Sequence, residues 1–402
     1  MLGFGEIIAC KSLGASALSI TVLTMLSPIT AFAALWWGWI LKDRDQRRWV
    51  LLLGAIAYLA VLSGAMMNSV THLLILYALF YLAFTIFGPA ELRVMQQHLP
   101  AASTGRSYGA ALAFRMGIAA AVSAGAGFWL DHHNAGWKQI FPISALVGFI
   151  AMLPLASIPT GKHTDETGKH RQTDHFRIVG MNRQTLLHPV RDVLALLKRR
   201  KDFLRFEIAF MIYGIAFMML MPVVPIYLVD NLKLSYATIG LARGSLMALV
   251  MIPAMPLFGW LYDRSTPHRM GVWIFTLLAF YPLFLLAAGY LKGDWQLAMV
   301  YIAFAWFGVV MSGLTVIWSL SSLRFAKGED VSVYQSVHVA ATGVRGLVAP
   351  LFGYLVMTLF SINTALICAA VIWVIAGVAM GLMRRIDRRS GEMSSLRAEV
   401  KR

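Results

Sequence analysis

The stretch "FGWLYDRSTPHR" at residues 258–269 ends a long apolar run with an Asp-Arg pair. A similar stretch, "GWILKDRDQRR" at residues 38–48, also follows an apolar run. The paired aspartates are Asp43 and Asp263, so one pattern occurs at the same kind of position in each half of the chain. This recurrence predicts a protein built from two repeated halves.

The composition is that of an integral membrane protein. Of the 402 residues, 59% are hydrophobic and only 13% are charged, which exceeds the apolar share of a soluble domain. The formal net charge of +16 does not indicate nucleic-acid binding, because membrane proteins gather Lys and Arg in their cytoplasmic loops. Cys10 and Cys368 are far apart and form no metal-ligand spacing, so we expect both to be packing residues without a disulfide.

Eleven apolar runs are long enough to cross a bilayer, which takes about 20 helical residues. They lie at residues 16–41, 49–69, 72–97, 105–131, 138–159, 203–229, 236–262, 270–291, 295–323, 332–360 and 363–384. Residues 1–13 are too short to cross and lack the features of a signal peptide, so we expect a fragment of a helix there. The pattern predicts an all-α polytopic bundle of about 11 transmembrane helices.

The positions of Lys and Arg predict the orientation of the chain. The loops on one side hold nearly all of these residues, and the other side holds only Lys11, Lys138, Lys233 and Lys292. By the positive-inside rule the basic side faces the cytoplasm, which places the C-terminus inside and the N-terminus outside. We expect the chain to lie in a bacterial cytoplasmic (inner) membrane.

Polar segments divide the chain into four parts. We expect an N-terminal half bundle of about five spans at 1–160, a basic cytoplasmic linker at 161–202, a C-terminal half bundle of six spans at 203–386 and a basic cytoplasmic tail at 387–402. The linker ends in "PVRDVLALLKRRKDF", where apolar residues recur at helical intervals beside Arg and Lys. That pattern fits a helix in the cytoplasmic interface, and it fits a solvated linker with a short helix equally well.

The Asp-Arg stretches match a family signature. The order G-x-x-x-D-R-x-x-x-x-R is intact in the second copy as Gly259, Asp263, Arg264 and Arg269, whereas the first copy has Trp39 in the glycine position. With its two similar halves and basic linker, the chain resembles the major facilitator superfamily of secondary transporters over nearly its whole length. The resemblance implies a bundle of two halves and solute movement by alternating access. It also implies that the first helix of the family is missing, which leaves helices 2 to 12.

The resemblance further implies a gating role for the charged helix ends. Such charges hold the two halves together while the cavity faces outward and release them when it faces inward. In the first copy the gating residues are Asp43, Arg44, Arg47 and Arg48. The alternative is that the arginines of both copies only fix the topology, since any cytoplasmic loop carries some Arg.

Ionisable residues inside the apolar spans carry the functional prediction, because a charge at mid-bilayer is costly without a partner or a cavity. Arg115 and Arg345 occupy similar positions in the two halves, and each follows Tyr or His residues at helical spacing. One interpretation is that they bind an anionic or oxygen-rich solute. The alternative is that they brace each half by pairing with a carboxylate or with backbone carbonyls. The predicted solute contacts are Arg115, Arg345, His338, Tyr334, Tyr108 and, with a weaker case, Arg243.

Glu91 is the predicted proton-coupling residue, together with Arg93. A partly buried carboxylate beside cationic groups can bind and release a proton as access alternates. The preceding Gly88 and Pro89 can weaken or kink the helix and free a carbonyl. A static ion pair between Glu91 and an arginine is the alternative.

The sequence lacks the parts of an enzyme. It contains no phosphate-binding loop, metal-ligand spacing or nucleophile elbow, so we expect no catalytic residues, no metal and no cofactor. The expected partners are a small solute, the lipid bilayer and a coupling proton or ion. Two other functions stay open: export of hydrophobic compounds, and a degenerate or sensory relative that transports nothing.

Overall fold

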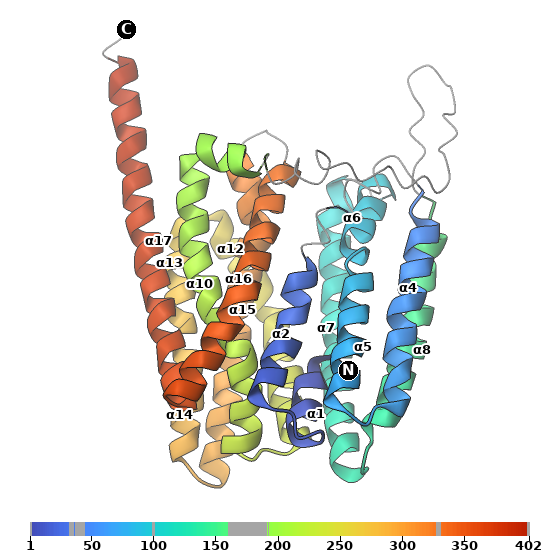
Figure 1. The fold of residues 1–402 in the computed structure, drawn as a ribbon. Coiled ribbons are helices and arrows are strands. Elements are labelled where there is room, and N and C mark those ends of the chain that lie inside the picture. Colours follow the sequence, from blue (N-terminus) through green and yellow to red (C-terminus); the bar gives the residue numbers. More distant parts are fainter. Residues whose placement is uncertain are drawn as a thin grey trace. The chain divides into compact units, whose positions relative to one another are not determined.

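The computed structural model describes residues 2–31, 36, 45–98, 101–159, 191, 193–326 and 331–399. Within these ranges the chain is helical and contains no β-strand. The helices of each unit run side by side (Figure 1). A helix satisfies its own backbone hydrogen bonds, which lipid cannot do, so this architecture suits a bilayer. The predicted all-α polytopic bundle is confirmed.

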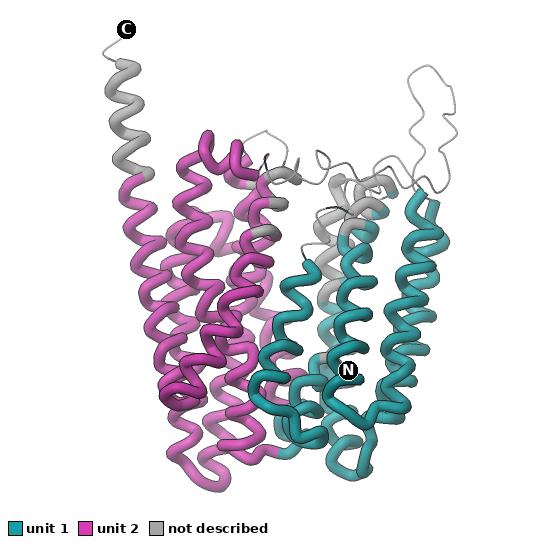
Figure 2. Tube along the Cα trace, in the orientation of Figure 1, with its two compact units in different colours: residues 1–189, 235–240 teal, residues 190–234, 241–402 magenta. Residues whose placement is uncertain are grey.

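The chain forms two compact units, coloured separately in Figure 2. Unit 1 comprises residues 1–189 and 235–240, and unit 2 comprises residues 190–234 and 241–402. The helices of unit 1 are α1 (Gly5–Lys11), α2 (Ala17–Ala31), α4 (Arg47–Leu62), α5 (Val70–Phe84), α6 (Phe87–His98), α7 (Ala101–His132), α8 (Trp137–Ser157) and α11 (Tyr236–Ile239). The helices of unit 2 are α10 (Lys201–Ile226), α12 (Met247–Asp263), α13 (Pro267–Leu278), α14 (Phe280–Tyr290), α15 (Asp294–Ala326), α16 (Val331–Leu359) and α17 (Ile362–Glu399).

Each of the eleven predicted spans contains helix in the residues that the structure describes. In that part of the chain nine helices are long and apolar enough to cross a membrane, and α2 and α5 are shorter apolar helices. The predicted span 72–97 is divided, because α5 ends at Phe84 and α6 begins at Phe87. The break directly precedes Gly88 and Pro89, where the sequence predicts a weakened helix. Of the predicted linker at 161–202, residues 161–190 lie outside the described ranges, and residues 193–199 are helical.

Polar side chains begin two of the spanning helices. At the start of α5, Ser69 Oγ accepts a hydrogen bond of 3.2 Å from the backbone N–H of His72. At the start of α13, Thr266 Oγ1 accepts one of 3.2 Å from the Arg269 N–H, and Pro267 occupies the first turn. These side chains satisfy amides that have no partner within the helix, which fixes where each span starts.

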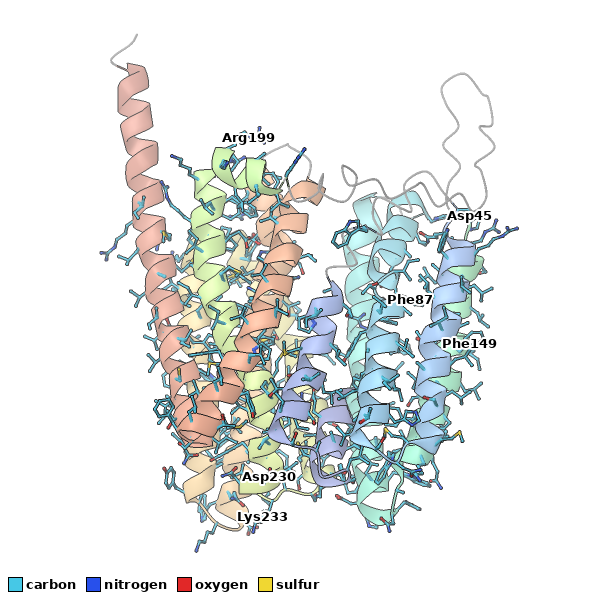
Figure 3. All side chains as sticks on the ribbon, viewed as in Figure 1. Asp45, Phe87, Phe149, Arg199, Asp230 and Lys233 are labelled. Carbon is cyan, nitrogen blue, oxygen red and sulfur yellow. The ribbon has the colours of Figure 1, made fainter. Side chains whose placement is uncertain are left out.

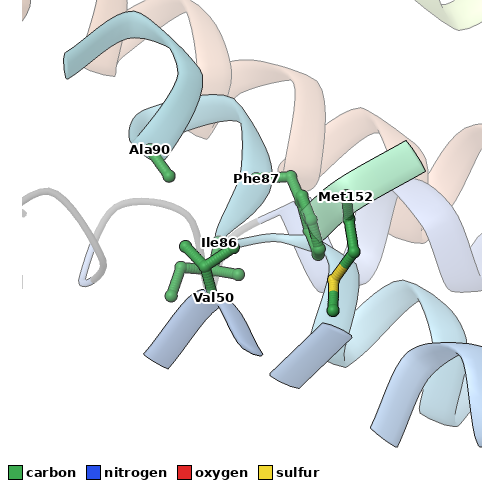
Figure 4. Packing of buried hydrophobic residues seen from close by; sticks show 5 residues of the cluster. All are labelled: Val50, Ile86, Phe87, Ala90 and Met152. Atoms are coloured by element: carbon green, nitrogen blue, oxygen red, sulfur yellow. The ribbon is translucent and has the colours of Figure 1, made fainter. Parts of the chain in front are cut away.

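The core of unit 1 forms around the break between α5 and α6 (Figure 4). The buried cluster consists of Val50, Ile86, Phe87, Ala90 and Met152. Gln46 is also buried, and its Nε2 donates a hydrogen bond of 3.1 Å to the Ala90 carbonyl. These contacts join α4, α6 and α8, so packing holds the break and the start of α6 in place.

The core of unit 2 is organised around α10, which packs along α16 and α17. Arg199 lies at one end of this unit and Asp230 and Lys233 at the other, so α10 runs between them through its interior (Figure 3). Helix α16 approaches α10 closely at Gly353, where an added Cβ would lie 2.2 Å from the Met219 carbonyl oxygen. A backbone atom cannot move aside as a side chain can, so this contact requires glycine.

We expect Gly353→Ala to lower the unfolding temperature of the purified protein. In an open helix the same change stabilises by up to about 1 kcal/mol, but here the new methyl group meets the α10 backbone. Gly125→Ala in α7 is the matched control, because an added Cβ there has nothing within 4 Å. An unfolding temperature for Gly353→Ala as high as that of the control would show that the two helices can separate at no cost.

Residues 235–240 belong to unit 1, although the chain on both sides of them belongs to unit 2. We call this segment the clip. A π-helical turn, η3 (Tyr227–Asn231), precedes it, and a second one, η4 (Gly240–Leu246), begins at its last residue. Asp131 of α7 accepts hydrogen bonds from the backbone N–H groups of Tyr236 and Ala237, at 2.9 and 2.7 Å. A carboxylate of unit 1 therefore caps the first amides of α11.

Other groups of unit 1 support the same capping interaction. Lys11 Nζ lies 4.0 Å from an oxygen of Asp131, and the hydroxyls of Ser12 and Tyr236 share a hydrogen bond. Burial lowers the pKa of the Lys11 ammonium, and attraction to Asp131 opposes that shift. Gly127 of α7 allows the close approach, since an added Cβ would lie 2.7 Å from the Tyr236 carbonyl oxygen.

Asp131→Ala should release the clip. Loss of a helix cap costs about 1–2 kcal/mol, so we expect amide hydrogen exchange at Tyr236 and Ala237 to become roughly tenfold faster. The control is His132→Ala, because His132 is exposed and bonds only to a carbonyl of its own helix. Exchange mass spectrometry of peptides that cover residues 235–240 measures the effect. Unchanged exchange in Asp131→Ala would mean that other contacts hold the clip.

Candidate functional site

A cluster of ionisable side chains is buried inside unit 2, where α10 and α16 pack together. Glu207 of α10 is 4% exposed and His338 of α16 is 1% exposed. Nδ1 of His338 lies 2.6 Å from Oε1 of Glu207, which is a short hydrogen bond. A buried carboxylate needs such a partner to offset the free energy of removing it from water.

Arg345 completes this group, seven residues after His338 and on the same side of α16. It is 4% exposed, and its Nη1 donates a hydrogen bond of 3.0 Å to the Phe210 carbonyl of α10. Its Nη2 donates one of 2.9 Å to Thr342 Oγ1. The guanidinium lies against Gly214, since an added Cβ there would be 2.4 Å from Nε and Nη1. We call Glu207, His338 and Arg345 the polar cluster.

Aromatic rings surround the polar cluster. The ring centre of His338 lies 4.1 Å from that of Trp318 and 4.5 Å from that of Phe210. The guanidinium carbon of Arg345 lies 5.6 Å from the centre of the Phe210 ring and 5.8 Å from that of Trp318. The faces of aromatic rings attract cations by about 0.5–2 kcal/mol, so this surrounding favours positive charge.

Each member of the polar cluster has a buried polar atom without a hydrogen-bond partner in the part of the chain that the structure describes. These atoms are Glu207 Oε2, His338 Nε2 and Arg345 Nε. Buried polar atoms of native proteins nearly always have partners, so an unpaired set in one place indicates a site for a polar ligand or a proton.

Glu207 is the candidate site residue that the sequence prediction missed. It lies in "DFLRFEIAF", within the predicted span 203–229 and beside apolar residues, and a carboxylate in that setting is itself a signal of function. Glu207 is a carboxylate within a predicted span, as Glu91 is, and its negative charge balances the positive charge of Arg345. The hydrogen bond from Arg345 to a backbone carbonyl has the geometry of the bracing alternative.

Tyr334, predicted as a solute contact, takes part in a separate set of contacts at the start of α16. Its hydroxyl accepts a hydrogen bond of 2.8 Å from Arg200 Nη1. Arg200 also forms an ion pair with Asp202 and donates a hydrogen bond of 2.7 Å to the Phe325 carbonyl. These contacts tie the ends of α10, α15 and α16 together, and they explain why Tyr334 is only 1% exposed.

The other predicted solute and proton residues are not joined to the polar cluster by any contact of the described residues. Arg115 and Glu91 are exposed, and no described contact connects them. Arg243 is partly buried and lies in the π-helical turn η4. The side chains of Tyr108 and Arg93 lie outside the described residues. The roles of these residues stay predictions.

The first copy of the gating motif is only partly described. Asp43 and Arg44 lie outside the described ranges. Arg47 is exposed and its Nη2 forms an ion pair of 2.7 Å with Asp45, while Arg48 is also exposed. The described residues of this first copy therefore contain one ion pair, between Asp45 and Arg47, which are two residues apart in the sequence. Exposed ion pairs of this kind contribute little to stability.

In the second copy, backbone carbonyls rather than Asp263 bind the nearby arginine. Asp263 is the last residue of α12, is exposed, and forms no ion pair with any described residue. Arg324 of α15 donates a hydrogen bond of 2.7 Å to the Ser265 carbonyl. Its guanidinium carbon also lies 4.9 Å from the ring centre of Tyr262. A cation at a helix C-terminus satisfies carbonyls that the helix leaves unpaired.

The two arginines of this copy stack on tryptophans. The guanidinium carbon of Arg264 lies 4.0 Å from the ring centre of Trp260, and that of Arg269 lies 5.1 Å from the ring centre of Trp273. Both arginines are exposed. Tryptophan and arginine are residues that settle at membrane–water interfaces, so this arrangement fits the end of a span. The gating role itself stays a prediction.

A family model and several solved structures match the chain. The family model described as Major Facilitator Superfamily matches residues 5–325 and, in a second match, residues 206–399. The matches together cover nearly all of the chain and overlap in its second half. A search among curated protein sequences finds no match.

Several solved structures share the fold. A mutant of the nucleoside transporter NupG has a TM-score of 0.67 and 15% identity, covering 95% of this chain and 94% of that one. A structure described under substrate recognition in proton-dependent oligopeptide transporters has a TM-score of 0.62 and 15% identity, covering 96% and 95%. A bacterial homologue of the human lysosomal transporter Spinster, inward-facing and unoccupied, has a TM-score of 0.56 and 13% identity, covering 92% and 96%. Identities this low show similarity of fold alone.

A double-mutant cycle should reveal how Glu207 and His338 depend on each other. His338→Leu leaves the carboxylate buried without its partner, so we expect a loss of about 3–5 kcal/mol in the free energy of unfolding. The double variant Glu207→Leu/His338→Leu removes both groups and should be clearly more stable than His338→Leu alone. Unfolding in detergent with increasing sodium dodecyl sulfate measures the wild type, Glu207→Leu, His338→Leu and the double variant. Additive losses would show that the two side chains are energetically independent.

Proposed function

The chain belongs to the Major Facilitator Superfamily, and from this we propose that it is a secondary active transporter that moves a small polar solute across a membrane by alternating access, driven by a proton. One observation carries the proposal. Three ionisable side chains of unit 2 are buried together within apolar helices, and each keeps a polar atom without a described partner. We propose that this polar cluster binds both the proton and the solute.

Energetics support a functional reason for the polar cluster. Burying an ionised carboxylate and a guanidinium in an apolar bundle costs several kcal/mol, which mutual attraction only partly offsets. Apolar side chains of similar size would often make such a helix pair more stable. Ionisable groups within membrane spans are therefore functional candidates by default, and a group of three strengthens that inference.

Each member of the polar cluster has a distinct role in this proposal. The hydrogen-bonded pair of Glu207 and His338 holds the coupling proton, since it contains two titratable groups 2.6 Å apart. Arg345 supplies the fixed positive charge that attracts oxygen atoms of the solute. In this proposal Arg115 is the counterpart of Arg345 in unit 1, as their similar positions in the sequence predict.

The solved relatives are consistent with a small polar solute. One is the nucleoside transporter NupG, and another is described among proton-dependent oligopeptide transporters. In our proposal this chain likewise lies in a cytoplasmic membrane with its C-terminus inside, in line with the distribution of Lys and Arg. Glu207 then lies in the cytoplasmic part of α10, because that helix begins at Lys201.

Transport in proteoliposomes tests the proposal. Vesicles that contain the full chain receive a panel of anionic, sugar and hydrophobic solutes, with and without an inward proton gradient. We expect the gradient to drive accumulation of at least one polar solute in the wild type. Glu207→Gln should abolish gradient-driven accumulation, because it removes the charge of the pair.

Glu91→Gln is the matched control, since it makes the same chemical change in unit 1. Retained accumulation in Glu91→Gln with loss in Glu207→Gln supports the polar cluster as the proton site. The reverse result assigns the coupling to Glu91. Gradient-driven movement of hydrophobic compounds alone would instead favour the export function.

A further inference from the structure

The hydrogen bond to Glu207 determines which nitrogen of His338 can take up a proton. An ionised carboxylate only accepts hydrogen bonds, so Nδ1 of a neutral His338 must carry the hydrogen that Glu207 Oε1 receives. Nε2 then carries a lone pair, and it is buried without a described partner. A proton that binds the imidazole binds at Nε2, which changes that atom from a hydrogen-bond acceptor into a donor.

The charges of the polar cluster balance before any proton is added. Arg345 contributes one positive charge, ionised Glu207 one negative charge, and neutral His338 none. The neighbouring α15 presents the uncharged Trp318 to His338, and α17 contributes Trp373, whose indole bonds to the Tyr213 carbonyl of α10. The net charge of the polar cluster is therefore zero, as is usual for groups buried in an apolar bundle.

Two further titratable groups lie near the polar cluster, and neither changes this balance. Tyr213 of α10 places its ring centre 6.0 Å from the guanidinium carbon of Arg345, and burial in an apolar core keeps the hydroxyl of a tyrosine protonated. His268 of α13 is separated from His338 by Phe206, whose ring centre lies 5.6 Å from one and 6.5 Å from the other.

We propose that the solute is a monoanion with carboxylate-type oxygens, and that it binds together with one proton on Nε2 of His338. This inference rests on the proposed function and specifies its solute. A proton alone would leave the buried cluster with a net positive charge, and an anion alone would leave it with a net negative charge. Both states are unfavourable in a medium of low dielectric constant, so each ligand increases the affinity for the other.

The hydrogen-bond donors of the polar cluster also favour an anionic solute. With His338 protonated, Nε2–H and the unpaired Nε–H of Arg345 are two donors, and a carboxylate is a strong double acceptor. The rings of Trp318 and Phe210 contact the imidazole, and ring faces stabilise an imidazolium by cation–π attraction. The aromatic rings thus stabilise the protonated form of His338, and the two donors bind the anion.

Glu207 acts as a positioning residue in this mechanism. It fixes the tautomer of His338, and its negative charge is the reason that the cluster needs a proton before it accepts an anion. If Glu207 is neutral, Arg345 alone provides the positive charge that an anion needs. The geometry therefore predicts an unusual result: Glu207→Gln still binds the anion, but it binds no proton with it.

Calorimetric titration of the purified full chain in detergent tests this inference. The probes are monocarboxylates and their own amides: pyruvate and pyruvamide, benzoate and benzamide, nicotinate and nicotinamide. Titration in two buffers of different ionisation enthalpy gives the number of protons taken up per bound probe. We expect at least one carboxylate to bind with one proton and about tenfold lower affinity per unit of rising pH, while its amide binds weakly and without a proton.

Variants separate the steps of the mechanism. Glu207→Gln should reduce the proton count to zero and abolish the pH dependence of carboxylate binding. His338→Gln should weaken carboxylate binding at every pH, because nothing then balances the second negative charge. Asp230→Asn, which neutralises an exposed carboxylate at the end of unit 2, should keep the count at one proton. A thermal unfolding curve for each variant confirms that it is folded, and the proton count is a quantity that a purely structural role would not change.

Four results would overturn the inference. They are amides that bind as tightly as their carboxylates, wild-type carboxylate binding without a proton, a full proton count in Glu207→Gln, and no binding of any carboxylate. The proposed function survives these results if the wild type accumulates a solute of another class along a proton gradient and Glu207→Gln abolishes that accumulation. It fails separately if Glu207→Gln leaves gradient-driven accumulation intact.

Discussion

The free energy of burying charge in an apolar bundle is the constraint on which unit 2 depends. Glu207 and His338 share a hydrogen bond of 2.6 Å, and Arg345 donates to the Phe210 carbonyl at 3.0 Å. These three side chains are only 1–4% exposed, so water cannot form hydrogen bonds with them. Groups of the facing helix accept or donate those hydrogen bonds instead. The position of α10 relative to α16 is therefore set by polar contacts as much as by packing.

These contacts occur in the same order along both helices. From the start of α10 onward, Arg200 bonds Tyr334, Glu207 bonds His338, and Phe210 bonds Arg345. The order shows that α10 and α16 run in the same direction. Glycines make the approach close enough, because Gly214 leaves space for the guanidinium and Gly353 touches the α10 backbone. Polar pairing and glycine packing depend on each other here.

Unit 1 satisfies its polar groups in a different way. Its best-described polar contacts lie at the clip, where Asp131 accepts hydrogen bonds from two amides at the start of α11. The clip is followed in the chain by η4, a π-helical turn that contains Arg243. Such turns often occur at functional positions in helices, because one extra residue per turn leaves a carbonyl available.

The sequence by itself determined the class of the protein, its all-α polytopic architecture, the family and two of the three residues of the polar cluster, His338 and Arg345. Periodicity and hydropathy are local properties, and a helix in lipid needs no partner to complete its backbone hydrogen bonds, so these features can be read along the chain. The interruption before Gly88 was also predictable, because the effect of Pro89 is local.

Only the tertiary structure decided which charges meet. Glu207 and His338 are 131 residues apart, and the choice of Glu207 over Glu91 as a partner follows from how α10 packs along α16. Asp131 likewise caps α11, which lies more than a hundred residues further along the chain. Tyr334 accepts a hydrogen bond from Arg200 and does not join His338 and Arg345, its neighbours along α16. Helical spacing places side chains on one face of a helix, but only packing between helices determines what that face contacts.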